Sequence, residues 1–123
     1  MKNQRICIVG GGLTGLSTAL VLCKLNLEVD IFYNDVNTLV FKDERVTAIS
    51  DNNFEFLKKN IKNLENKIFW SCNKIGLFHE NKKKCLNFLN FNEKNYLMHI
   101  FKNKRLKKNL FQLLKSKKIK IIK

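Results

Sequence analysis

A cluster of glycines near the N-terminus constrains this chain more than any other feature. The apolar run Ile6 to Val9 ends directly in Gly10, Gly11 and Gly12, and Gly15 follows inside a segment with helical periodicity. The spacing is G-x-G-x-x-G, and it lies between a buried-type strand and an amphipathic helix. This context predicts a strand, a tight turn and a helix, the opening of an α/β fold with a parallel sheet.

Each glycine of the motif has its own expected role. Gly10 lets the chain turn out of the strand, Gly12 lets a pyrophosphate approach the backbone, and Gly15 lets the helix lie close to the strand. The helix that begins near Leu13 would direct its free N–H groups and its positive dipole end at the phosphates. The residues predicted to hold a dinucleotide here are Gly10, Gly11, Gly12, Leu13, Thr14 and Gly15.

The second strand of this unit is predicted at Val29 to Tyr33, after a helix from about Leu13 to Lys24. So short a connection forces a parallel pair with a right-handed crossover. An acidic residue that binds the adenosine ribose is expected at the tip of this strand, about 20 residues beyond the glycines. Tyr33 stands there instead, so Asn34 or Asp35 is predicted to substitute.

The remaining chain alternates between helical and extended patterns. Helices are predicted at Asp51 to Asn60 and Lys104 to Lys115, and strands at Lys74 to Phe78, Cys85 to Phe91, Tyr96 to Phe101 and Lys118 to Ile122. The middle pair of strands reads as a hairpin, whose aromatic side chains we expect in the core.

These elements predict a Rossmann-like core with an insertion. The core would comprise residues 1–60 and 96–123, with a small inserted β region at 64–95. The last strand would lie beside the opening strand. A parallel sheet of three strands leaves edges and faces that need cover, so the domain is expected to be incomplete.

Charge and cysteines narrow the functional classes. The net charge is +14, almost all from lysines spread along the chain after Lys58, which is a compositional bias rather than a patch selected for phosphates. A basic module that binds RNA or an anionic membrane remains the alternative from a different class, and peripheral membrane contact remains open.

Cys7 and Cys23 are predicted to be buried thiols in a reducing, cytoplasmic compartment. The cysteine and histidine spacings match no common zinc pattern, so no metal is expected.

Three motifs together resemble the flavin-dependent aromatic hydroxylases, most closely the ubiquinone-biosynthesis (2-polyprenyl-6-methoxyphenol) hydroxylase branch. The first is Ile8 to Leu16, similar to that family's FAD fingerprint. The second is Asp43 to Ser50, which looks like the family segment D-x-R-x-x-A-L-S. The third is Phe101 to Leu110, which matches a helix pattern E-N-x-x-L-x-x-x-L, with Lys102 in place of the glutamate.

The resemblance implies specific roles. Arg45 would lie along the flavin's pyrophosphate and ribose, and Asn103 would contact the cofactor. The family hydroxylates an aromatic ring with FAD, NADPH or NADH, and O₂. The chain matches only about the first third of such an enzyme, so the resemblance assigns no catalytic side chain. We expect an FAD-binding portion that is inactive alone, with a missing C-terminal portion; another FAD-dependent oxidoreductase, such as an amine oxidase or a reductase, is the nearest enzymatic alternative.

Overall fold

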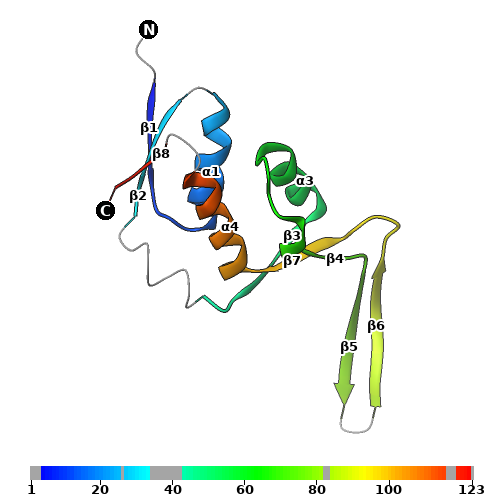
Figure 1. Ribbon diagram of the computed structural model, residues 1–123. Helices are drawn as coiled ribbons and strands as arrows, with labels where there is room; N and C mark the ends of the chain where they lie inside the picture. The colour runs from blue at the N-terminus through cyan, green and yellow to red at the C-terminus, as the bar shows by residue number, and fades with distance from the viewer. Residues whose placement is uncertain (1–3, 26, 34–42, 82–83, 116–118, 123) are drawn as a thin grey trace.

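The computed structural model describes residues 4–25, 27–33, 43–81, 84–115 and 119–122. They form a body of two small sheets with helices, from which a long hairpin projects (Figure 1). The elements run in the order β1 (Arg5–Val9), α1 (Leu13–Leu22), a 3-10 turn (Cys23–Leu25), β2 (Glu28–Phe32), β3 (Val46–Ser50), α3 (Asp51–Asn60), a second 3-10 turn (Asn66–Ile68), β4 (Trp70–Cys72), β5 (Lys74–Asn81), β6 (Lys84–Asn92), β7 (Met98–Lys102), α4 (Asn103–Lys115) and β8 (Ile119–Ile122).

The first sheet is parallel and has the strand order β1-β2-β8. Val29 pairs with Ile6 on one side and with Ile119 on the other. The predicted strand–helix–strand opening is therefore confirmed. The expectation that the last strand lies beside the opening strand is wrong, because β8 pairs with β2 instead.

The position of β8 follows from crossover handedness. Helices α1 and α4 pack side by side (Figure 1), so the two crossovers lie on the same face of the sheet. A right-handed crossover on the same face must step in the same direction as the first one. The step from β1 to β2 is therefore followed by a step to the far edge of β2.

The core lies between this sheet and its two helices. Leu16, Ala19 and Leu20 of α1 are buried against Val29 and Ile31 of β2. From α4, the residues Leu106, Leu110, Phe111 and Leu114 complete the same cluster. This is the periodicity that the sequence predicted for both helices.

The opposite face of the parallel sheet is open. In-register neighbours share a face, so Cys7 lies beside Asp30, and Val9 lies beside Phe32. Val9 is 85% exposed and Phe32 is 40% exposed. The prediction of a buried Cys7 thiol is wrong, because Cys7 points to this uncovered face and is exposed. Cys23 is only partly buried.

The second sheet is antiparallel, has the order β3-β7-β4, and carries α3. Ser50 caps α3 by accepting a hydrogen bond from the Asn53 N–H at 3.4 Å. His99 of β7 is fully buried, stacks on Phe54 of α3 and lies 2.7 Å from Asp51 Oδ1. These contacts fix the start of α3 on the sheet. Within the described residues, no helix has the length and apolar character needed to cross a bilayer.

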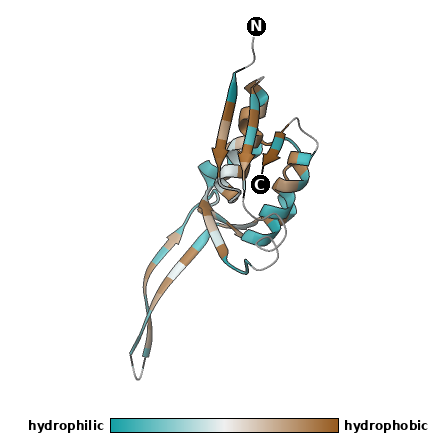
Figure 2. Ribbon diagram, turned by 90° about the vertical axis from the view of Figure 1, so that its left-hand side faces the viewer, coloured by the Kyte–Doolittle hydropathy of each residue, from teal (hydrophilic) through white to brown (hydrophobic). Residues whose placement is uncertain are grey.

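The hairpin of β5 and β6 stands apart from both sheets (Figure 2). Its pairing places Ile75 opposite Phe91, Leu77 opposite Leu89, and His79 opposite Leu86, so one face is apolar. The expectation that hairpin aromatics lie in the core is wrong, because Phe88 is 64% exposed and Phe91 is 46% exposed. The hairpin itself was correctly predicted, but nothing among the described residues covers its apolar face.

A charge on the apolar face of the hairpin should reduce self-association of the chain. We expect Leu89→Lys to lower light scattering and the fluorescence of an apolar dye, without lowering the melting temperature, because Leu89 is 42% exposed. Asn90→Lys adds the same charge to the opposite face of the hairpin, where Phe78 is an exposed aromatic side chain, and is the matched control. Equal effects of the two variants would show that net charge, and not the apolar face, drives association.

Candidate functional site

The N-terminus of α1 offers uncapped backbone donors at the end of β1. Gly12 is the N-cap residue, and no side chain of the described residues caps this helix end. The first turn of α1 also contains no acidic residue. Free N–H groups and the positive end of the helix dipole therefore point out of this turn, which is the arrangement that binds phosphate groups.

The glycines differ in what surrounds them. Gly10 has φ of +114°, a conformation that side chains rarely adopt. A Cβ at Gly15 would overlap the carbonyl oxygen of Gly10, and a Cβ at Gly11 would overlap the ring of Tyr33. A Cβ at Gly12 would meet nothing within 4 Å. The space in front of Gly12 is therefore open to a ligand, whereas Gly11 and Gly15 are closed by the fold and Gly10 is restricted by its backbone conformation.

Tyr33 closes one side of the glycine turn from Gly10 to Gly15, which is the predicted phosphate loop. The N–H of Gly10 donates to the carbonyl of Phe32 at 2.9 Å, and the N–H of Tyr33 donates to the carbonyl of Ile122 at 2.9 Å. The Tyr33 side chain is buried and lies against Gly11. Asn34 and Asp35, the predicted substitutes for the ribose-binding carboxylate, lie outside the described residues.

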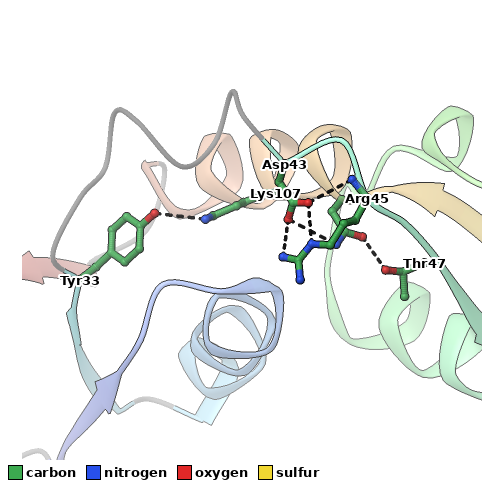
Figure 3. Close-up of polar contacts among 6 residues, drawn as sticks. Tyr33, Asp43, Arg45, Thr47 and Lys107 are labelled. Atoms are coloured by element: carbon green, nitrogen blue, oxygen red, sulfur yellow. Dashed lines mark hydrogen bonds and ion pairs between the residues drawn. The ribbon is translucent and has the colours of Figure 1, made fainter.

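Arg45 is held by a bidentate ion pair with Asp43 (Figure 3). Arg45 Nε donates to Asp43 Oδ1 at 2.8 Å, and Arg45 Nη2 donates to Asp43 Oδ2 at 2.7 Å. The guanidinium holds the pKa of the Asp43 carboxyl well below its usual range, and the carboxylate raises the pKa of Arg45. The side chain of Arg45 is 80% exposed, so the donors that Asp43 does not use face solvent.

Asn103 ties this ion pair to α4. Its backbone N–H donates to the carbonyl of Arg45 at 3.0 Å, and its Oδ1 accepts from Thr47 Oγ1 at 2.6 Å. Its Nδ2 donates to Asp43 Oδ2 at 3.4 Å. The structure thus brings Arg45 and Asn103 together through Asp43, and both ends of the Asn103 amide are engaged within the protein.

A cavity of about 600 Å³ adjoins the phosphate loop between α1 and α3. Leu13 and Thr14 line its end nearest the loop, and Thr47 lines its floor. Its other walls are mostly apolar, with Val21, Phe56, Leu57 and Phe101 among them. Two of the predicted site residues, Leu13 and Thr14, therefore border one hollow with Thr47 of β3, the strand that begins directly after Arg45.

Four residues of this region were not singled out in the sequence as ligand contacts. They are Tyr33, Asp43, Thr47 and Lys107, whose contacts are drawn in Figure 3. Lys107 lies four residues after Asn103 on α4 and hence on the same helix face, which is a signal that the sequence did contain.

The fold matches solved structures of monooxygenases. Comparisons with protein-family models and with curated proteins find no match for this chain. The structure of p-nitrophenol 4-monooxygenase from Pseudomonas putida DLL-E4 has a TM-score of 0.75 at 18% identity, over 97% of this chain and 32% of that chain. That of 2-methyl-3-hydroxypyridine-5-carboxylic acid oxygenase has a TM-score of 0.75 at 16% identity, over 99% and 32%. CtdE in complex with FAD has a TM-score of 0.66 at 16% identity, over 98% and 30%.

The close approach of Gly15 to the Gly10 carbonyl predicts that an alanine at position 15 destabilises the fold more than an alanine at position 12. Gly15→Ala should lower the free energy of unfolding by about 2 to 4 kcal/mol, because α1 must move off the Gly10 carbonyl. Gly12→Ala should cost about 1 kcal/mol or less, because its Cβ enters open space and only the cap preference is lost. Urea denaturation followed by circular dichroism measures both, and equal losses would contradict the close approach of α1.

The comparisons establish the fold and its extent. The chain spans about a third of the length of each solved structure that it resembles. Two of those structures are of a monooxygenase and an oxygenase, and the third, CtdE, is in complex with FAD. The chain therefore shares the fold of about a third of each of these structures.

Proposed function

We propose that this chain is the FAD-binding portion of a flavin-dependent monooxygenase that hydroxylates an aromatic ring. The observation that carries the proposal is the uncapped start of α1 at Gly12, which opens onto free space at the end of a parallel strand. The structures that share the fold support this assignment, since they include a monooxygenase and a protein in complex with FAD. A ubiquinone-precursor-like ring is the proposed substrate class, on the resemblance of Asp43 to Ser50 and Phe101 to Leu110.

The chain's own residues would hold the adenosine and pyrophosphate end of FAD. The first N–H groups of α1, with Leu13 and Thr14, would donate to the pyrophosphate, and Arg45 would add a guanidinium beside it. Asp43 and Asn103 would orient that guanidinium through the hydrogen bonds described above. When bound, FAD supplies the redox chemistry with NADPH or NADH and O₂, which protein side chains cannot supply.

We propose further that the chain is inactive alone and completes its site with a polypeptide portion outside these 123 residues. The uncovered face of the parallel sheet and the apolar face of the hairpin support this, because both are surfaces that folded proteins normally cover. About two-thirds of each similar monooxygenase has no counterpart in this chain. The walls that would exclude water from the flavin ring are proposed to come from that portion.

The direct test of the proposed function is FAD titration of the parent and of Gly12→Val. The added methyl groups enter the space where we place the pyrophosphate, so we expect FAD binding to be lost. Far-ultraviolet circular dichroism should show the same helix content in both proteins, because nothing in the fold occupies that space. Equal affinities in the two proteins would remove the pyrophosphate from this site. Binding to RNA that falls steeply with salt, without FAD binding, would favour a basic binding module.

Arg45 gives a second test in the same titration. Arg45→Ala should weaken FAD binding by about 1.5 to 3 kcal/mol, the range for hydrogen bonds to charged groups. Arg45→Lys should recover only part of this loss, because an ammonium cannot reproduce the bidentate fork that Asp43 now orients. If the parent and both variants bind FAD equally, Arg45 is a surface charge and the role implied by the resemblance is wrong.

A further inference from the structure

Lys107 is a buried ammonium at the side of the phosphate loop. It lies on α4 and is 8% exposed, far below the usual exposure of a lysine. Its Nζ donates to Tyr33 Oη at 3.1 Å and lies 5.2 Å from the centroid of the Tyr33 ring. Neighbouring lysines on the same helix are more exposed, since Lys104 pairs with Glu44 at the surface and Lys108 is exposed.

The described contacts of Lys107 include no opposite charge. Among the residues that the structure describes, no carboxylate oxygen lies within 4.0 Å of Lys107 Nζ. The phenol of Tyr33 is a neutral acceptor, and an ammonium has three donors. Burial of a charge without an opposite charge costs free energy, so such groups are retained where an anion will meet them.

The position of this ammonium is fixed relative to the glycines. Tyr33 follows β2 directly, and its ring fills the space that a side chain at Gly11 would occupy. The Tyr33 hydroxyl then extends to Lys107, on the side of α4 that also carries Asn103 (Figure 3). Tyr33 thus connects Lys107 to the glycine turn, while Arg45 lies on the chain directly before β3.

We propose that Lys107 binds a phosphate of the dinucleotide, and that Tyr33 holds the ammonium in place for it. This inference rests on the proposed function and deepens it. Tyr33 thus has a positioning role at the strand tip where related folds carry an acidic ribose contact. The ligand chemistry is a nucleotide phosphate, supplied by FAD or by a smaller nucleotide such as ADP.

The experiment compares ADP, adenosine and FAD on the parent and on matched variants. Lys107→Met keeps an unbranched apolar stem of similar length and removes the charge. Lys108→Met makes the same change at the exposed neighbour. Tyr33→Phe keeps the ring over Gly11 and removes the hydroxyl that accepts from Lys107. Affinities come from calorimetry or NMR titration, and melting temperatures from circular dichroism.

Lys107→Met should lower the affinity for ADP and for FAD about 10-fold or more, and leave the affinity for adenosine unchanged. Its melting temperature should be equal to or above that of the parent, because an uncompensated buried charge is removed. Tyr33→Phe should lower ADP affinity roughly threefold. Lys108→Met should change none of these quantities.

The outcomes that would overturn the inference also show whether the proposed function fails with it. If Lys107→Met binds ADP like the parent, or loses ADP and adenosine equally, Lys107 is a packing residue and the proposed function stands. If the parent itself binds neither FAD nor ADP, the proposed function fails, and the inference fails with it.

Discussion

The contact of Gly15 with the Gly10 carbonyl is the constraint on which the other parts of this structure depend. It lets α1 lie directly against the end of β1, closer than any side chain at position 15 would permit. From that position α1 buries Leu16, Ala19 and Leu20 on β2, and its other side becomes the surface on which α4 packs. The same contact sets the start of α1, and with it the open space before Gly12. One short backbone distance thus determines both how α1 packs and where the open space before Gly12 lies.

The two sheets are joined at the site by polar contacts rather than by a shared strand. Asn103 begins α4, while its amide and backbone reach Asp43, Arg45 and Thr47 in the chain that enters β3. Since α4 also covers the parallel sheet, the orientation of Arg45 depends on the parallel sheet as well as on β3, which follows it directly. An arginine held in this way loses less conformational freedom on meeting a phosphate.

The sequence was sufficient to predict the parts of the fold that are local. The strand–turn–helix at the glycines, the limits of α3 and the apolar face of α4 all follow from spacing within a few residues. The glycine motif also predicted the tight turn with positive φ at Gly10 and the close approach of Gly15, because its spacing encodes a backbone geometry. The segment that contains Thr47 was recognised as a motif, but the sequence analysis did not predict that it forms strand β3.

What was not predicted depends on contacts between distant segments. The side of β2 that receives β8 depends on where α4 packs, and the exposure of Phe88 and Phe91 depends on what covers the hairpin; an alternating pattern reports neither. The burial of Lys107 was missed for the same reason. The spacing of four residues places Lys107 on the same helix face as Asn103, but in a chain of net charge +14 that spacing does not distinguish a buried lysine from a surface lysine until Tyr33 is seen beside it.

The pairing of β2 with β8 has a consequence for how this protein is made. The parallel sheet is complete only when Val29 pairs with Ile119, and pairings between residues so distant in sequence form slowly. At a typical synthesis rate, the ribosome needs roughly 5 to 20 seconds to add the intervening residues. During that time β2, whose Val29 and Ile31 are almost fully buried in the finished fold, has one unpaired edge. The nascent chain is therefore a natural client for chaperones that bind short apolar strands, and the exposure ends only when β8 has emerged from the ribosome.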